Sequence, residues 1–441
     1  MNIARYYYNN GLIQLDILFI IIIITLTVYF LITSLMKDLR PKLFLATLFL
    51  GIFFYSGFGI AYEDINNRFI YHYTIFLVSF GVPFIFCRNI KQDNIFSPFD
   101  KSLIENSRTL SFLAYFYLFL NLVPLIIPEF RLFDIFTFKS ASMSIHVLKD
   151  LSRGNVYVSL ADTLAVLLAP FFYAYFTITQ EHNPKTNKPL ILYIILIILQ
   201  FGRYNYIPRY MMMTDLANIL LLTFCVKGFY YKIKLKHIMI GLFVAMFMIP
   251  ILYLYTYFRS GDIYVGNTSF STLFDLLIKS EAYYPAFYSD ILRHLEFLNE
   301  SITGFISYVL CLPIPSFIWS SKPSYTAITS FTYMITGYTR GETGFYILLP
   351  SIMGESFIIG GEKWFWLFSL SSGTAISLTF RYLCSKKCLT FYSFIILVLG
   401  FSYARGGTMV LLPILINGSV AIFIYDLYVK KKSKKRKSSN L

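Results

Sequence analysis

Arginines stand at places where apolar runs of the sequence end, at Arg203, Arg209, Arg259 and Arg405. Arginine stays charged at any physiological pH, and its planar fork of donors binds phosphate oxygens through paired hydrogen bonds. If these helix ends lie on one side of a membrane, the four side chains suit an anionic group such as a diphosphate. Each one alone also fits a simpler interpretation, in which the side chain reaches water or pairs with Asp215 or Asp262.

Among the carboxylates of the sequence, Glu355 is the best candidate for acid–base catalysis. It lies in the apolar run PSIMGESF, directly after Gly354. A carboxyl group buried beside apolar groups holds a proton more readily than one in water, and it can then act as a general base near neutral pH. The structural alternative is that Glu355 caps a helix or pairs with an arginine of the cluster.

The sequence contains no motif that requires a cofactor. It has no glycine-rich phosphate loop, no HExxH, no nucleophile elbow and no carboxylate pair at metal-ligand spacing. The five cysteines form no disulfide framework, and Cys384 with Cys388 lacks the further ligands that zinc needs. We therefore expect neither a metal nor a nucleotide.

These residues must be positioned by membrane helices. With 57% hydrophobic and 14% charged residues among 441, the chain carries more apolar surface than a soluble domain can bury. The fold class is therefore an all-α polytopic integral membrane protein. The net charge of +15 does not indicate nucleic-acid binding, because seven of the eight residues from Lys430 to Lys437 are basic and follow the last apolar run. Such a tail is typical of a cytoplasmic anchor on anionic lipid.

The distribution of Lys and Arg in the short loops predicts the topology. Counting the apolar runs that are long enough to cross a bilayer gives about 11 spans, with a range of roughly 10 to 13. The predicted segments are an N-terminal bundle of about eight helices at 1–258, a large outer segment at 259–362, C-terminal spans at 363–429 and the basic tail at 430–441. The outer segment holds Arg340 and Tyr325, and its apolar stretches are too short to span and predict re-entrant or interfacial helices.

Two runs in the outer segment carry a family resemblance, PIPSFIWSSKPSY at 313–325 and LPSIMGESFIIGG at 349–361. Together with the many spans, the long outer segment and Arg405-Gly406 at the last outer turn, they make the chain similar to the bacterial O-antigen polymerase (Wzy) family. These enzymes polymerise oligosaccharide repeat units. The resemblance implies a multi-pass protein of the bacterial inner membrane whose active site faces the periplasm.

The resemblance also implies a reaction. A growing glycan on undecaprenyl diphosphate would pass to the terminal sugar of an incoming lipid-linked repeat unit, without a metal or a nucleotide sugar. Glu355 and Arg405 would be catalytic, with Glu355 taking or orienting the hydroxyl proton. Binding of diphosphate or glycan would fall to Arg203, Arg209, Arg259, Arg340 and Tyr325. Expected partners are the lipid-linked oligosaccharide, membrane lipids, a chain-length regulator and a flippase, and no nucleic acid.

Other functions remain open at this stage. An O-antigen ligase uses the same donor with a lipid A core acceptor, and a histidine in the outer segment such as His294 would favour it. A transporter or flippase of lipid-linked sugars would have charges deep within several helices, whereas here such charges are few, mainly Asp162 and Asp215. A structural membrane protein would explain the topology but not the arginines.

Overall fold

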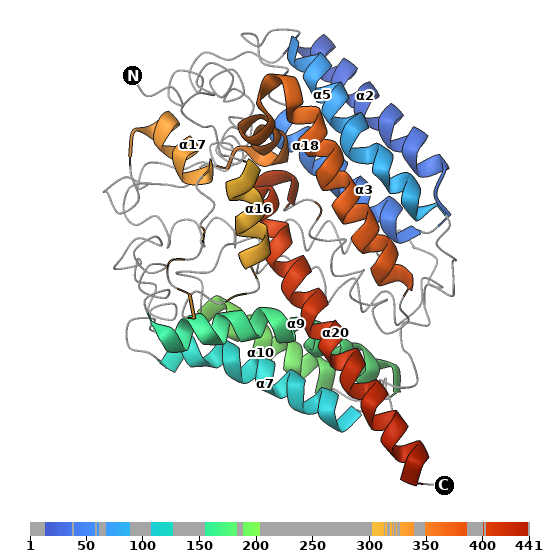
Figure 1. Cartoon of the computed structure of the whole chain (residues 1–441), viewed down its shortest axis with the longest axis vertical. Coiled ribbons are helices and arrows are strands. Elements are labelled where there is room, and N and C mark those ends of the chain that lie inside the picture. The colour runs from blue at the N-terminus through green and yellow to red at the C-terminus, as the bar shows by residue number, and fades with distance from the viewer. Residues whose placement is uncertain are drawn as a thin grey trace. The chain divides into compact units, whose positions relative to one another are not determined.

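The computed structural model describes residues 14–37, 39–57, 68–88, 107–126, 155–182, 188–202, 302–312, 327–338, 349–385 and 403–439, with a few single residues besides. Within these ranges all regular structure is helical and no strand occurs (Figure 1). The chain divides into two compact units. Unit 1 combines Met1–Asp93, Phe274–Ile314 and Ser321–Ile416, and unit 2 combines Asn94–Leu273, Pro315–Ser320 and Asn417–Leu441.

The helices of unit 1 come from both ends of the chain. They are α2 (Leu15–Ser34), α3 (Leu39–Ile52) with the π-helical turn η1 (Phe53–Gly57), α5 (Arg68–Gly81) with the 3₁₀ turn η2 (Val82–Cys87), α16 (Ile302–Cys311), α17 (Ala327–Thr336), α18 (Ser351–Ser385) and the start of α20 (Thr408–Ser439). Long apolar runs form these helices, because a helix satisfies its own backbone hydrogen bonds and so tolerates an apolar environment. Threonines inside them bond to the carbonyl one turn earlier, as Thr33 does to Tyr29 at 2.7 Å.

The core of unit 1 lies where α5 and α18 pack side by side (Figure 1). At Gly373 of α18 an added Cβ would stand 2.2 Å from the carbonyl oxygen of Phe80 in α5, so the two backbones touch. Small residues permit this close approach of membrane helices. Around the contact the rings of Phe44, Phe84 and Phe380 lie with centroids 4.9 to 6.5 Å apart. The interface is therefore built from one glycine and large aromatic side chains.

A buried hydrogen bond joins α2 to α5. The hydroxyls of Thr25 and Tyr73 lie 2.8 Å apart, and Thr25 donates its own proton to the carbonyl of Ile21 at 2.7 Å, so Tyr73 is the donor. We expect Tyr73→Phe to lower the free energy of unfolding by about 1 kcal/mol, the net contribution of one such bond. Thermal unfolding of the purified protein in detergent measures this. Tyr29→Phe is the control, since the bond of Tyr29 to the Lys42 carbonyl is 3.4 Å long and weaker; an equal loss in both variants would contradict the prediction.

Unit 2 contains α7 (Ser107–Ile126), α9 (Val156–His182), α10 (Lys188–Gly202) and the later part of α20. Asn155 is the N-cap of α9, since its side-chain oxygen accepts hydrogen bonds from the backbone nitrogens of Tyr157 and Val158 at 3.0 and 3.3 Å. The rings of Tyr117 in α7 and Phe172 in α9 pack with centroids 5.0 Å apart. The described part of unit 2 is thus a helical group with an aromatic contact at its centre.

The prediction of an all-helical chain is confirmed for the described residues. In the described part of the chain, four helices are long and apolar enough to cross a membrane, at Leu15–Ser34, Arg68–Cys87, Arg108–Ile126 and Val156–Phe176. The count of about 11 spans stays a prediction, since several expected spans lie outside the described ranges. The four predicted segments also stay predictions. The range of α18, Ser351–Ser385, consists of two helices joined at Gly361, whose backbone is not helical, next to the boundary expected after residue 362.

Candidate functional site

Glu355 lies in the first turns of α18 and joins that helix to the start of α20. Its side chain is buried, with 2% of its surface exposed. Its Oε2 accepts hydrogen bonds from the backbone nitrogen of Thr408 at 2.8 Å and from the Thr408 hydroxyl at 2.7 Å. Thr408 is the first residue of α20, so the carboxylate caps a helix that begins 53 residues later in the chain. The two donors and the positive end of the helix dipole stabilise its negative charge.

The turn before α20 is shaped to receive this carboxylate. Gly407 has a φ of +62°, in the left-handed region that favours glycine. A Cβ on Gly407 would lie 2.5 Å from Glu355 Oε2, so only glycine leaves space for the carboxylate. Tyr403, five residues before Thr408, is also buried, with 2% of its surface exposed. The Glu355 carboxylate and the start of α20 are thus joined by two hydrogen bonds in a buried setting.

Arg405 lies among the helical residues 403–406, which end at Gly407, and residues 403–408 are called the Arg405 turn below. Its guanidinium carbon lies 5.8 Å from the centre of the Tyr55 ring in η1, a cation–π geometry. Tyr55 is itself buried, with 7% exposed, while Arg405 is half-buried. The ring of Tyr55 therefore packs against the guanidinium of Arg405, and the hydrogen bonds of Glu355 to Thr408 fix the end of the same segment.

Serine hydroxyls surround the start of α18. The hydroxyls of Ser351 and Ser56 lie 3.1 Å apart, and Ser351 also accepts from the backbone nitrogen of Gly354 at 3.4 Å. Ser369 donates to Ser356 at 3.3 Å, and both are buried. The interior of unit 1 is therefore polar near Glu355, although the helices around it are apolar.

The order of the elements explains why these groups meet. Tyr55 and Ser56 lie in η1, directly after α3, while Glu355 lies at the start of α18 and Arg405 just before the start of α20. The contacts between Ser56 and Ser351 and between Glu355 and Thr408 join these ends directly. One end of unit 1 thus gathers a cation, a carboxylate and several hydroxyls from three distant parts of the sequence.

No family model, no protein of curated function and no solved structure matches the chain. The site is therefore interpreted from its own geometry. Among the described residues, no group of three or more His, Cys, Asp or Glu side chains could hold a metal ion.

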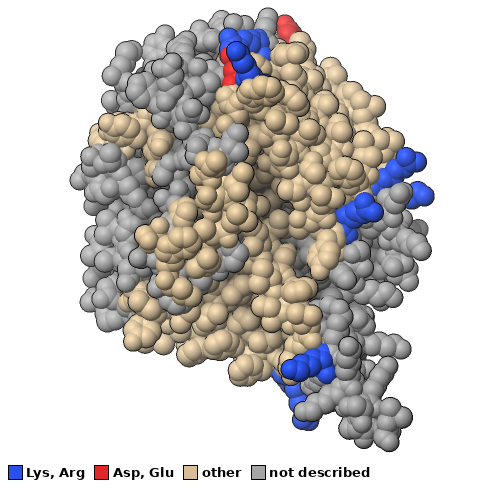
Figure 2. Space-filling view, viewed as in Figure 1, with Lys and Arg blue, Asp and Glu red and all other residues tan. Residues whose placement is uncertain are grey.

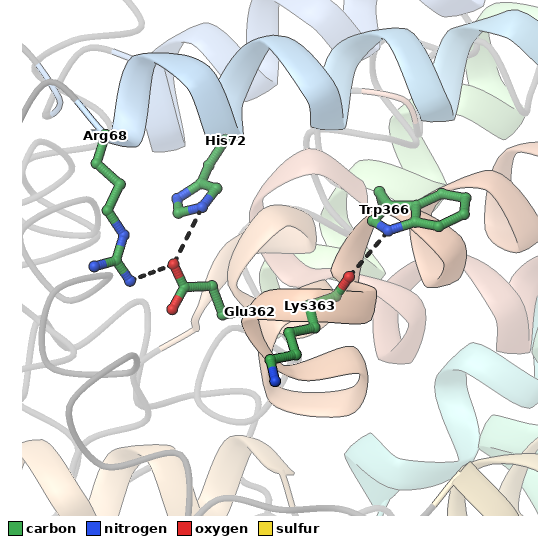
Figure 3. Close-up of polar contacts among 5 residues, drawn as sticks. All are labelled: Arg68, His72, Glu362, Lys363 and Trp366. Atoms are coloured by element: carbon green, nitrogen blue, oxygen red, sulfur yellow. Dashed lines mark hydrogen bonds and ion pairs between the residues drawn. The ribbon is translucent and has the colours of Figure 1, made fainter.

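A second charged cluster, between α5 and α18, was missed by the sequence reasoning. Glu362 Oε1 forms an ion pair with Arg68 and lies 3.4 Å from His72 Nε2 (Figure 3). Arg68 and His72 are one turn apart on α5, and Lys363 points away from them. Glu362 follows the kink at Gly361, where φ is +62°. The signal in the sequence was the run GGE at 360–362 together with a histidine inside an apolar helix, but neither indicates the other as a partner.

The predicted site residues divide into two groups. The structure brings Glu355 and Arg405 to one turn. The remaining five, for which the predictions of substrate binding stand as made, lie outside the described residues: Arg203, Arg209, Arg259, Arg340 and Tyr325. On the face drawn in Figure 2 most of the described surface is uncharged, charged side chains stand in a few separate groups, and the acidic ones gather at one end.

Proposed function

We propose that this protein is a polymerase of lipid-linked oligosaccharide repeat units in a bacterial inner membrane, with its site open to the periplasm. It would transfer a growing glycan from undecaprenyl diphosphate to a sugar hydroxyl of the next lipid-linked unit. The observation that supports the proposal is the Arg405 turn, in which a cation lies over a buried ring three residues before Thr408, which a buried carboxylate binds. A cation fixed in this way is suited to an anionic leaving group, because it needs no rearrangement as charge develops.

In the proposed reaction the acceptor hydroxyl oxygen attacks the anomeric carbon of the donor glycan. The bond from that carbon to the phosphate oxygen breaks, and its electron pair leaves with the lipid diphosphate, whose charge Arg405 stabilises. The hydroxyl proton passes to a base. Glu355 serves here as a positioning residue for the Arg405 turn, since its Oε2 already accepts two hydrogen bonds from Thr408. Its predicted role as general base remains a prediction.

The test is the surface polysaccharide of a strain from which the gene has been deleted. We expect single repeat units on the lipid core after deletion and a ladder of longer chains when the intact gene is returned. If deletion instead removes every unit from the core while long lipid-linked glycan accumulates, the protein is a ligase and the proposal is wrong. Unchanged polysaccharide after deletion would contradict both functions.

A further inference from the structure

The Arg68, His72 and Glu362 cluster presents one free carboxylate oxygen. Both contacts of Glu362 use Oε1, and no described residue forms a hydrogen bond or an ion pair with Oε2. The side chain of Glu362 is 40% exposed and that of Arg68 is 48% exposed. The carboxylate is therefore held at one oxygen and can accept hydrogen bonds from a ligand at the other.

His72 contacts the same carboxylate oxygen of Glu362 from α5. Its side chain is only 7% exposed and packs edge-on against Phe357 and Phe365, at centroid distances of 5.4 and 5.3 Å. Its Nδ1 is buried and has no hydrogen-bond partner among the described residues. A proton on Nε2 would face Glu362 Oε1 at 3.4 Å and leave a lone pair on Nδ1, which costs less when buried than an unbonded N–H. Arg68 and His72 thus hold Oε1 from two directions.

The surroundings of Glu362 favour a neutral, hydroxyl-rich ligand. The charges of Arg68 and Glu362 cancel, and a free carboxylate oxygen repels phosphate but accepts hydrogen bonds from sugar hydroxyls. Exposed aromatic rings follow closely in the sequence: Tyr71, next to His72, is 65% exposed, and Trp364 is 60% exposed. Such rings pack against the C–H faces of sugars. The Arg405 turn, by contrast, offers a cation and suits the anionic donor.

We propose that Glu362 binds a hydroxyl group of the acceptor sugar through Oε2, with Arg68 and His72 as positioning residues. This inference rests on the proposed function, since it takes the incoming repeat unit as its ligand. It gives unit 1 two sites of different chemistry: a cationic one at Arg405 for the lipid diphosphate and a carboxylate one at Glu362 for the sugar that receives the chain.

The test compares Glu362→Gln with Arg68→Gln in the purified full chain in nanodiscs. Both variants break the same ion pair, but only Glu362→Gln removes the carboxylate. The probe is the repeat-unit oligosaccharide released by mild acid from the lipid-linked units of the deletion strain, and its dissociation constant is measured by titration. We expect Glu362→Gln to weaken binding about tenfold, the loss of one charge-assisted hydrogen bond. Arg68→Gln should weaken it about threefold or less, because His72 still holds Oε1.

Equal losses in the two variants would show that the ion pair is only structural, and unchanged binding by Glu362→Gln would also overturn the inference. If Glu362→Gln does not fold, the same binding measurement is made with Glu362→Asp. It keeps the charge and shortens the side chain by one methylene, so binding should again weaken, and unchanged binding overturns the inference. The proposed function fails separately, when the intact gene does not restore the ladder in the deletion strain.

Discussion

Gly407→Ala is expected to lower the free energy of unfolding by about 3 kcal/mol and to abolish function, because two penalties meet at one residue. The φ of +62° places an alanine in the left-handed region, which costs about 1 to 2 kcal/mol. The new Cβ would also lie 2.5 Å from Glu355 Oε2, far inside van der Waals contact. The carboxylate must move, and its bonds to Thr408 are lost as it does. Thermal unfolding in detergent and the polysaccharide ladder measure the two effects.

Gly337→Ala separates the two penalties. Gly337 has a φ of +73°, yet a Cβ there meets no atom within 4 Å, so this variant carries only the backbone strain. Gly337→Ala should lower the free energy of unfolding by about 1 to 2 kcal/mol. Gly407→Ala should also cost less in a Glu355→Ala background, since the carboxylate that it clashes with is absent. If the two glycine variants were equally destabilised, the carboxylate would not fill the space above Gly407.

The sequence predicted the elements of this site better than their contacts. Long apolar runs predicted helical spans in segment 1–258, and helix α2 occupies Leu15–Ser34, because an uninterrupted apolar run has few alternatives to a helix in an apolar environment. For Glu355 the sequence allowed both a catalytic and a capping role. The cap is observed, but its partner Thr408 is 53 residues away, and no periodicity relates two residues at that distance.

The cluster at Glu362 shows the same limit. Hydrophobic patterning placed Glu362 at the end of the outer segment and Arg68 within the N-terminal bundle. It gave no reason to pair them, since their contact depends on how α5 packs on α18. That packing depends in turn on Gly373 and on the kink at Gly361. A glycine pair before a glutamate was visible in the sequence, but its meaning depends on a tertiary contact.

Arg405→Ala is expected to reduce chain extension about 10²- to 10³-fold, the effect of removing one preorganised group from a developing charge. Lysine at this position should restore only part of the rate, because it lacks the planar fork of donors and packs less well against the Tyr55 ring. The measurement is the rate of extension of purified lipid-linked repeat units by the full chain in nanodiscs, with thermal unfolding of each variant alongside. The Arg405 side chain is half-buried at a turn that Glu355 already holds, so stability should change little.

Arg381→Ala is the matched control, since it removes the same charge from an exposed position near the end of α18. It should leave extension unchanged. An equal loss in both variants would mean that net charge, rather than the position of Arg405, determines the rate. Normal extension by a stably folded Arg405→Ala protein would remove the observation that supports the polymerase proposal. A loss confined to Arg405→Ala, with stability retained, would instead place the leaving group at the turn that Glu355 and Tyr55 hold.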